Sequence, residues 1–359
     1  MHVDCLIIGQ GISGTLLSWF LHKEGKTFLV IDNNKVDSSS KVAAGIINPI
    51  TGRRYVTTWM IDEVMPFAID TYRSLESYLQ YSFVYEKSII DFFPSPQMLN
   101  AFVDRIAEND TYLHSYPNQN QFNQYFNYDF GCGEIRPSYT IHLPLLLELW
   151  KQKLKEWNAI KEEEFLLADL QTSDDHASYH DITAGKVIFC DGVDAATNPW
   201  FRLLPFAPNK GEAMIIEAEE LYNGHIFKRG LMLAPLPTPG IFWVGSNYQW
   251  EFADDKPSEH FYKQTSNLLQ NWIKVPFKIV DHKAAIRPAT VERRPFVGFH
   301  PHFPVIGILN GMGTKGTSLA PFFAHQLTQH LVYDLPIADE ANVHRFTRIL
   351  SREIGKGSS

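Results

Sequence analysis

The sequence has few cysteines, no long apolar run and no excess of positive charge. Its three cysteines lie far apart and form no Cys-x-x-Cys pair. They therefore argue against a disulfide scaffold or a cysteine-bound metal, and they favour a reducing compartment. No stretch approaches the roughly 20 apolar residues of a membrane-spanning helix. The first apolar run, residues 3–8, is too short for a signal peptide, so we expect a cytoplasmic protein without a membrane span.

The charge balance also limits the classes of partner. Asp and Glu outnumber Lys and Arg by 40 to 32, a formal net charge of −8, which gives a polyanion no overall attraction. Hydrophobic residues make up 45% of the chain and aromatic residues 13%, enough for a large core, so intrinsic disorder is excluded as an overall description. The length of 359 residues corresponds to about two domains.

The clearest motif opens the sequence. A short apolar run at residues 3–8, typical of a buried parallel strand, leads directly into Gly-Gln-Gly-Ile-Ser-Gly at residues 9–14. An amphipathic stretch at residues 15–23 predicts a helix, and a second apolar run at residues 27–31 ends on Asp32. Strand, glycine-rich turn, helix, strand and terminal acid follow one another in the order of a dinucleotide-binding unit.

Each part of this unit has a physical role in dinucleotide binding. Gly9 permits the tight turn, Gly11 lets backbone approach a pyrophosphate, and Gly14 lets the helix pack on the strand. The helix N-terminus offers unpaired N–H groups and the positive end of the helix dipole to the phosphates. The sequence therefore predicts a dinucleotide cofactor.

Two further features concern the nature of that cofactor. Asp32 is the expected acceptor for the ribose hydroxyls, which argues against a 2′-phosphate. Residues 38–49 are first hydroxyl-rich and then apolar, so the hydroxyls of Ser39 and Ser40 can reach a pyrophosphate. The Ala-Ala-Gly at residues 43–45 permits close approach of backbone to a flat ring. Composition alone would favour a flexible loop for this segment, and the glycine motif alone does not distinguish NAD from FAD.

The rest of the chain alternates helical and strand patterns. Helices are predicted at residues 60–80, 143–157, 257–274 and 317–331, and strands at residues 186–190, 213–217, 230–234 and 241–245. Residues 82–135 are aromatic-rich and irregular, and their polar tract at 118–124 indicates a turn or exposed loop. No single cut separates two continuous domains, so we expect a discontinuous nucleotide domain with inserted β-rich segments.

More motifs stand in the C-terminal third. They are Ala-Ile-Arg-Pro-Ala-Thr at residues 285–290, Arg-Pro-Phe-Val-Gly at 294–298 and Gly-Met-Gly-Thr-Lys-Gly-Thr-Ser-Leu-Ala-Pro at 311–321. Together with the opening motif and the Ser-Ser and Ala-Ala-Gly segments, they make the sequence resemble the D-amino-acid oxidase family of FAD-dependent oxidoreductases. That family includes glycine and sarcosine oxidases and the oxidase domain of the bifunctional enzyme that modifies the tRNA wobble uridine. The motifs span residues 4–321 and are specific for the family but not for a substrate.

The resemblance implies a fold, a cofactor and a chemistry. The fold class is α/β with mixed α+β character: a discontinuous, Rossmann-like FAD-binding domain at residues 1–80, 136–205 and 280–359, with an inserted antiparallel-β substrate domain at 81–135 and 206–279. FAD should be held without a covalent bond, because family members with attached flavin carry a cysteine in the C-terminal region and this chain has none after Cys190. The chemistry is oxidation of a primary or secondary amine next to a carboxylate, by hydride transfer to flavin N5 and imine hydrolysis, with oxygen or a quinone as electron acceptor.

Three residues are the candidates for substrate chemistry. Arg287 matches the family arginine that binds the substrate carboxylate, since a guanidinium gives a carboxylate two parallel hydrogen bonds. The alternative is a structural arginine paired with a carboxylate such as Glu292. Tyr248 follows a predicted strand where relatives place an active-site side chain, although it could equally be an ordinary aromatic residue at a strand end. Lys315 lies before a predicted helix whose N-terminus would stabilise negative charge on reduced flavin, and a solvent-facing lysine is the alternative.

The cofactor-binding set that the resemblance implies is larger. Its members are Gly9, Gly11, Ile12, Ser13, Gly14, Asp32, Ser39, Ser40, Ala43, Ala44, Gly45, Ile46, Phe165, Asp191, Gly192, Gly311, Gly313, Thr314, Lys315, Gly316 and Thr317. Phe165 or Leu166 falls near the position where relatives hold the adenine through backbone groups, and the register is open between the two. His300 and His302 have no third ligand in sequence, so a surface turn is expected there and no metal site.

Two other functions remain open from sequence. A tRNA-modification oxidase acting on a carboxymethylaminomethyl-uridine fits the same motifs, because its substrate is also a secondary amine with a carboxylate. The net charge of −8 counts against tRNA, since polyanion affinity comes largely from Lys and Arg contacts. A flavin-binding module without turnover is the second alternative, and the intact glycine motif with Asp32 and Arg287 argues against it.

Overall fold

The structure is a computed structural model that describes residues 1–108 and 111–352, and these divide into two compact units. Unit 1 comprises Met1–Lys41, Leu143–Asn209 and the described residues from Ile286 onward. Unit 2 comprises Val42–His142 and Lys210–Ala285. Each unit is therefore assembled from segments that are distant in sequence.

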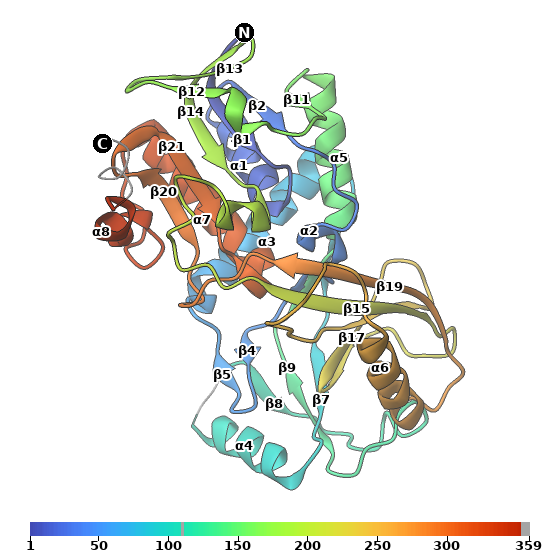
Figure 1. The fold of residues 1–359 in the computed structure, drawn as a ribbon. Helices are drawn as coiled ribbons and strands as arrows, with labels where there is room; N and C mark the ends of the chain where they lie inside the picture. Colours follow the sequence, from blue (N-terminus) through green and yellow to red (C-terminus); the bar gives the residue numbers. More distant parts are fainter. Residues whose placement is uncertain (109–110, 353–359) are drawn as a thin grey trace. The chain divides into compact units, whose positions relative to one another are not determined.

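The sheet of unit 1 is mainly parallel (Figure 1). Five strands pair side by side in the order β11-β2-β1-β14-β21, all in parallel, and β20 then pairs antiparallel with β21. Their bounds are β1 His2–Ile8, β2 Phe28–Ile31, β11 Ile160–Lys161, β14 Ile182–Phe189, β20 Phe296–His300 and β21 Phe303–Asn310. A hairpin of β12 (Leu170–Thr172) and β13 (Ala177–Tyr179) adds to β14. Strand β2 and the C-terminal halves of β1 and β14 are apolar and buried, as expected where both faces of a parallel sheet are covered.

Helices of unit 1 pack on this sheet and on one another. Helix α1 (Ile12–Lys23) contacts both α5 (Leu143–Glu156) and α7 (Gly316–Tyr333), and α7 also contacts β20 and β21. Short turns complete the unit: η1 Leu167–Asp169, η2 Gly192–Ala196, η3 Gly313–Lys315, η4 Val343–Phe346 and α8 Thr347–Leu350. The strand–turn–helix–strand order at the N-terminus, followed by parallel pairing of β1 with β14, is a Rossmann-like arrangement.

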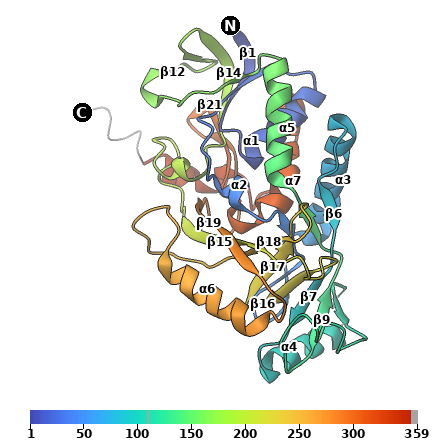
Figure 2. The same cartoon turned by 90° about the vertical axis from the view of Figure 1, so that its right-hand side faces the viewer.

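Unit 2 is built on a second sheet of order β19-β15-β18-β17-β16-β7-β9-β8 (Figure 2). Its pairs are antiparallel except for β16 with β7 among the pairings with a defined register. The bounds are β7 Ile89–Phe92, β8 Leu113–Ser115, β9 Cys132–Ile135, β15 Asn209–Glu217, β16 Ile226–Arg229, β17 Leu231–Pro235, β18 Ile241–Gly245 and β19 Lys278–Arg287. Aromatic side chains fill the core against helix α6 (Glu259–Trp272): Phe92, Phe122, Phe126, Phe227 and Trp272.

Smaller elements complete unit 2. They are β3 Ile46–Ile47, β6 Val84–Glu86 and β10 Tyr139–Ile141 in one small sheet, the pair β4 Ile50–Thr51 and β5 Val56–Thr57, and helices α2 Ser39–Val42, α3 Ile61–Leu79 and α4 Pro96–Ala107, of which α2 begins in unit 1. The boundaries differ from the expected ones, since residues 42–80, 136–142 and 280–285 lie in unit 2 and residues 206–209 in unit 1. The physical reason for the first two is strand pairing, because β3 and β6 both pair with β10.

The expected helices at residues 60–80, 143–157, 257–274 and 317–331 are found as α3, α5, α6 and α7. The first helix begins at Ile12, earlier than the amphipathic stretch suggested, because Gly11 is its N-cap. Helix α4 was missed, although Pro96 at its start and the Ser95 hydroxyl, which accepts from the Met98 amide at 3.4 Å, form a recognisable helix start. Within the described residues, no helix has the length and apolar character needed to cross a membrane.

Candidate functional site

The glycine motif of unit 1 is fixed by close backbone packing. Gly9 has φ +99°, and a Cβ placed there would lie 2.6 Å from the Cys190 carbonyl oxygen. A Cβ on Gly14 would lie 1.9 Å from the Gly9 carbonyl oxygen. The Gly9 amide donates to the Ile31 carbonyl at 2.8 Å, which ties the turn to β2. These two glycines therefore bring the start of α1 against the end of β1, as dinucleotide-binding turns require.

The start of α1 has the properties of an anion site. Its N-cap is Gly11, which has no side chain to cap the helix, and its first turn contains no acidic residue. The Ile12 amide donates to the Ser40 hydroxyl at 3.1 Å, so α2 lies beside this turn. A Cβ on Gly11 would lie 3.2 Å from the same hydroxyl oxygen. The N–H groups of a helix N-terminus, a nearby hydroxyl and a first turn without an acidic residue suit a pyrophosphate.

Asp32 stands at the end of β2, next to the glycine turn. Its Oδ1 accepts a hydrogen bond from the Gln10 amide at 2.8 Å, and its Oδ2 accepts one from the Asn34 amide at 2.9 Å. Each carboxylate oxygen can accept a second bond. Two backbone donors thus fix the orientation of the group while leaving acceptor capacity for ribose hydroxyls.

An asparagine that sequence reasoning missed joins two strand ends beside this turn. The Asn310 Nδ2, at the end of β21, donates to Asp191 Oδ1 at 3.0 Å and to the Gly192 carbonyl at 2.9 Å. Its Oδ1 accepts from the Gly311 amide at 2.8 Å. Burial raises the pKa of Asp191 to about 7, against the opposing effect of the Asn310 bond. The predicted pair Asp191–Gly192 and the predicted Gly311 are therefore held by one amide side chain.

The glycine-rich segment after β21 connects this region to the loop that follows Arg287. Gly311 has φ +78°, and a Cβ there would lie 2.8 Å from the Thr290 methyl carbon. The Gly313 amide donates to the Pro288 carbonyl at 3.1 Å. A Cβ on Gly316 would lie 3.5 Å from the Cγ2 of Ile12. The segment therefore runs between the start of α1 and the Arg287 loop.

Lys315 lies at the end of this segment. It is the N-cap residue of α7, is half-buried, and its carbonyl accepts from the Ser318 hydroxyl at 3.1 Å. Thr317 in the first turn is buried, Thr314 is exposed, and no acidic residue lies in that turn. The turn thus offers a second helix N-terminus with a lysine beside it, which favours negative charge.

Arg287 ends strand β19 and is anchored from its side. Its Nη1 donates to Asn209 Oδ1 at 2.8 Å, and Asn209 is only 2% exposed. The Glu292 carboxylate, the structural partner considered from sequence, lies 3.5 Å from Arg345 Nε. A neutral amide therefore orients the guanidinium of Arg287 at this contact. Sequence reasoning did not find Asn209, which is 78 residues away.

The backbone around Arg287 is fixed by a short series of hydrogen bonds. The Ala289 amide donates to the Arg287 carbonyl at 2.8 Å, and the Ala207 amide donates to the Ala289 carbonyl at 2.7 Å. The Thr290 hydroxyl donates to the Arg294 carbonyl at 2.8 Å. The Arg-Pro-x-Thr segment is thus a braced turn in unit 1, as a preorganised binding residue needs.

Other predicted residues belong to unit 2. Gly45 has φ +67°, and a Cβ there would lie 1.9 Å from the Ile141 carbonyl oxygen of β10. Backbone conformation and packing on β10 therefore both require glycine at this position. Of the neighbouring residues, Ala43 is exposed, and Ala44 and Ile46 are half-buried. Tyr248 is 59% exposed in the segment after β18.

The adenine and histidine candidates lie elsewhere in unit 1. Phe165 stacks on Tyr179 with 4.7 Å between ring centroids, and the Leu166 amide donates to the Tyr179 hydroxyl at 3.1 Å. His300 is buried at the end of β20, whereas the turn expected from sequence is formed by the next two residues. Across residues 1–108 and 111–352, no group of three or more His, Cys, Asp or Glu side chains could hold a metal ion.

Comparison with known proteins gives a family and a fold. A family model described as FAD dependent oxidoreductase matches residues 4–330. Glycine oxidase from Bacillus cereus ATCC 14579 aligns with a TM-score of 0.80 at 14% identity, over 93% of this chain and 96% of that one. Glycine oxidase from Geobacillus kaustophilus gives a TM-score of 0.77 at 17% identity, over 94% and 96%. Iminodiacetate oxidase from Chelativorans sp. BNC1 gives 0.73 at 17% identity, over 92% and 96%.

Proposed function

The chain belongs to the family of FAD-dependent oxidoreductases, and from this premise we propose that it oxidises a primary or secondary amine whose α-carbon bears a carboxylate. The substrate class comprises D-amino acids, glycine and N-alkyl glycines. The names of the structural neighbours, glycine oxidase and iminodiacetate oxidase, support this class. The observation that carries the proposal is the guanidinium of Arg287, oriented by a buried asparagine at 2.8 Å.

The residues of unit 1 fit the cofactor that the family uses. The first turn of α1 and the Ser40 hydroxyl would hold the pyrophosphate, and Asp32 would hold the ribose hydroxyls. The first turn of α7, with Lys315, would hold negative charge on the flavin ring. FAD, when bound, supplies a hydride acceptor. We propose that it is held without a covalent bond, because all three cysteines are buried and none follows Cys190.

The chain's own contribution to the reaction is orientation and electrostatics. Arg287 would bind the substrate carboxylate through two charge-assisted hydrogen bonds and so fix the α-carbon. The hydrogen bond to Asn209 restricts the Arg287 side chain before the substrate binds, so less conformational entropy is lost on binding. The substrate must present its nitrogen lone pair unprotonated, and after the α-carbon loses its hydride the imine is hydrolysed by water. Oxygen or a quinone is the proposed electron acceptor.

The test is anaerobic flavin reduction by a panel of glycine, sarcosine, iminodiacetate, D-alanine and L-proline. Arg287→Ala should lower the second-order rate constant of flavin reduction by roughly thirty- to several-thousand-fold, equivalent to about 2–5 kcal/mol. Arg287→Lys should recover only part, because an ammonium cannot reproduce the planar fork. FAD content should be unchanged. A wild-type rate in Arg287→Ala would contradict the proposal.

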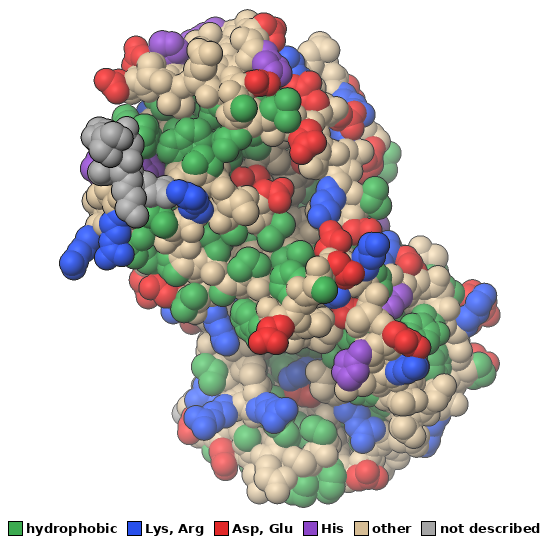
Figure 3. All heavy atoms as spheres, in the orientation of Figure 1, with side chains coloured by type: hydrophobic (Ala, Val, Ile, Leu, Met, Phe, Trp, Pro, Cys, Tyr) green, Lys and Arg blue, Asp and Glu red, His purple; other side chains and the backbone are tan. Residues whose placement is uncertain are grey.

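An amine without a carboxylate is the matched control for the comparison of wild type with Arg287→Ala. It should react equally slowly with wild type and with Arg287→Ala, since the ion pair is absent in both. The tRNA alternative predicts a different result, namely retention on immobilised tRNA that disappears as salt is raised. On the face in Figure 3, basic and acidic side chains are intermixed, in keeping with the net charge of −8.

A further inference from the structure

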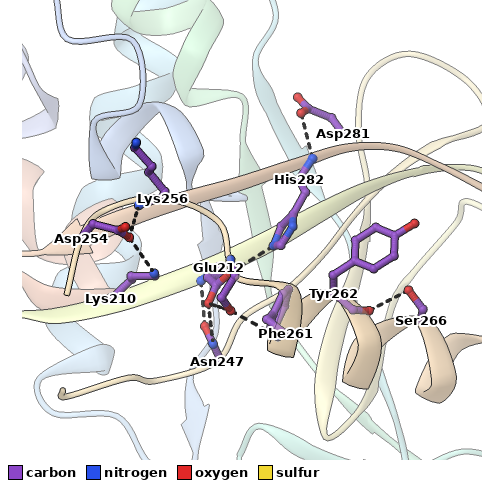
Figure 4. A network of polar contacts seen from close by, with 11 residues as sticks. Lys210, Glu212, Asn247, Asp254, Lys256, Phe261, Tyr262, Ser266, Asp281 and His282 are labelled. Carbon is purple, nitrogen blue, oxygen red and sulfur yellow. Dashed lines mark hydrogen bonds and ion pairs between the residues drawn. The ribbon is translucent and has the colours of Figure 1, made fainter. Parts of the chain in front are cut away.

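A buried carboxylate in unit 2 binds both ends of one neighbouring segment. Glu212 on β15 is 0% exposed, and each of its carboxylate oxygens accepts two hydrogen bonds (Figure 4). Oε1 accepts from Ser258 Oγ at 2.7 Å and from Asn247 Nδ2 at 3.3 Å. Oε2 accepts from the Ser258 amide at 2.6 Å and from His282 Nε2 at 3.1 Å.

Residues 247–258, called the strap below, are attached to β15 at further points. Asn247 Oδ1 accepts from the Glu212 amide at 2.8 Å, so this side chain bonds both the backbone and the carboxylate of Glu212. Gln249 and Lys210 exchange two backbone hydrogen bonds at 3.0 and 2.9 Å. The Lys210 ammonium, itself buried, lies 3.7 Å from Asp254 Oδ1. The strap is thus held at its start, its middle and its end by two residues of one strand.

The end of the strap is also the start of a helix. Ser258 is the N-cap of α6, and its hydroxyl oxygen accepts from the Phe261 amide at 3.2 Å while it donates to Glu212. The His282 ring stacks on Phe261 with 5.6 Å between centroids. One carboxylate therefore fixes the strap, the helix that follows it and a histidine of β19.

A charged group is needed here because four donors converge on it. A buried carboxylate is tolerated only when its lone pairs are filled, and leaving it partly unpaired is costly. Burial lowers the pKa of His282 despite the nearby carboxylate, so near pH 7 the histidine donates as a neutral ring. Asn247 and Ser258 of the strap donate three of the four hydrogen bonds to the Glu212 carboxylate. Movement of the strap away from β15 would therefore leave this buried carboxylate with one donor.

We propose that Glu212 is a positioning residue, which holds the strap in one conformation and through it fixes Tyr248. Tyr248 and Trp250 are 59% and 56% exposed, and they stand on either side of Gln249, whose backbone exchanges two hydrogen bonds with Lys210 of β15. The functional half rests on the proposed function and adds one contact to it, in which Tyr248, a candidate for substrate chemistry from the sequence, donates a hydrogen bond to the amine substrate. The conformational half stands by itself.

The conformational half is tested by hydrogen–deuterium exchange of the FAD-loaded full chain. Glu212→Gln keeps the shape of the side chain but presents an NH2 to donors. The peptide covering residues 247–258 should then exchange about tenfold faster or more, because roughly 1.4 kcal/mol of protection per lost net bond is removed. Glu217→Gln, on the same strand and outside the network, is the matched control and should leave strap exchange unchanged.

The functional half is tested by anaerobic flavin reduction with the best amine of the panel. Glu212→Gln should raise the substrate concentration for half-maximal reduction about tenfold, with a smaller change in the limiting rate and unchanged FAD content. Tyr248→Phe should weaken substrate binding in wild type but much less in Glu212→Gln. That non-additivity is what a residue acting through Tyr248 produces, and a general loss of stability does not.

Each outcome is decisive. Unchanged strap exchange in Glu212→Gln overturns the proposal. If hydrogen–deuterium exchange of the strap becomes faster but the effects of Glu212→Gln and Tyr248→Phe on substrate binding are additive, the functional half is overturned. Glu212 then only holds the strap in place. If no amine reduces the wild-type flavin, the proposed function fails, and strap exchange alone decides the role of Glu212. Should Glu212→Gln not fold, Asn247→Ala replaces it, since that change removes two bonds to Glu212 while three donors stay on the carboxylate.

Discussion

Asn310 donates a hydrogen bond of 3.0 Å to the carboxylate of Asp191 and so joins the ends of two neighbouring parallel strands, β21 and β14. The same amide also bonds the Gly192 carbonyl and the Gly311 amide. Both predicted cofactor segments at these strand ends therefore depend on one side chain. This coupling has a pH signature, because the carboxylate is buried.

The first prediction concerns this signature. The pKa of Asp191 is raised to about 7, above its unfolded value near 3.8, so the folded protein binds more protons between these two pH values. The free energy of unfolding should therefore fall as pH rises from 4 to 7, by at most about 1.4 kcal/mol per pH unit. Asp191→Asn should flatten that slope in urea titrations of the apoprotein. An unchanged slope would show that Asp191 ionises in the folded state as it does in the unfolded one.

The second prediction concerns the glycine motif. Gly11→Val places a branched side chain at the start of α1, where a Cβ alone would come within 3.2 Å of the Ser40 hydroxyl oxygen. The purified variant should carry little FAD, measured by absorbance after acid release, because backbone can no longer approach the pyrophosphate. Gly25→Ala, beyond the other end of α1, is the control: its φ of +66° makes the side chain a strain on folding, but nothing lies within 4 Å of a Cβ there, and the folded variant should keep its FAD. A full FAD complement in Gly11→Val would remove this turn from the cofactor site.

The third prediction concerns the buried ion pair of unit 2. The Asp91 carboxylate is almost fully buried and lies 2.6 Å from the Lys228 ammonium. Lys228→Ala should destabilise the protein by about 3–5 kcal/mol, because it leaves a buried carboxylate without its partner. Lys228→Ala combined with Asp91→Ala should cost less than the sum of the single changes. Denaturant midpoints of the four proteins check this, and strict additivity would mean that the two groups do not interact.

The fourth prediction concerns the thiols. Burial raises the pKa of both Cys5 and Cys132 to about 12, and it also raises the pKa of Cys190 well above its ordinary value. Because the thiolate is the nucleophile, an aromatic disulfide reagent at pH 8 should modify none of the three in the folded protein and all of them in denaturant. The same cysteines bear on how FAD is held: because none is proposed to bond the flavin, FAD should leave the polypeptide when the protein is denatured by heat. Flavin that remained attached to the denatured protein would contradict non-covalent binding.

Local signals predicted much of the fold. The glycine turn, the first strands and helices α3, α5, α6 and α7 follow from periodicity and capping, which act over a few residues. The residues that complete the candidate site act over longer distances. Asn209 reaches Arg287 across 78 positions, and Asn310 reaches Asp191 across 119. A lone asparagine carries no local pattern, so only the folded chain shows which group it bonds.

The same limit explains the unit boundaries. Residues 42–80 follow the nucleotide motif directly, and sequence continuity favoured placing them with it. Their assignment to unit 2 depends on pairing of β3 and β6 with β10, whose residues come much later in the chain. Gly45 illustrates the point, since the atom that requires glycine there is the carbonyl oxygen of Ile141.

The discontinuity of the units fixes the order in which synthesis can complete them. All residues of unit 2 precede Ile286, so every one of its strands has been made before β21 exists. Strand β14 pairs with β1 along one edge, and its other edge pairs with β13 at residues 182–184 and with β21 at residues 187–189. Until synthesis reaches β21, residues 187–189 of β14 lack their parallel neighbour on that edge. Unpaired strand edges invite association with other chains. During translation this part of β14 therefore lacks its parallel neighbour while more than a hundred further residues are added, Lys210–Ala285 of unit 2 among them.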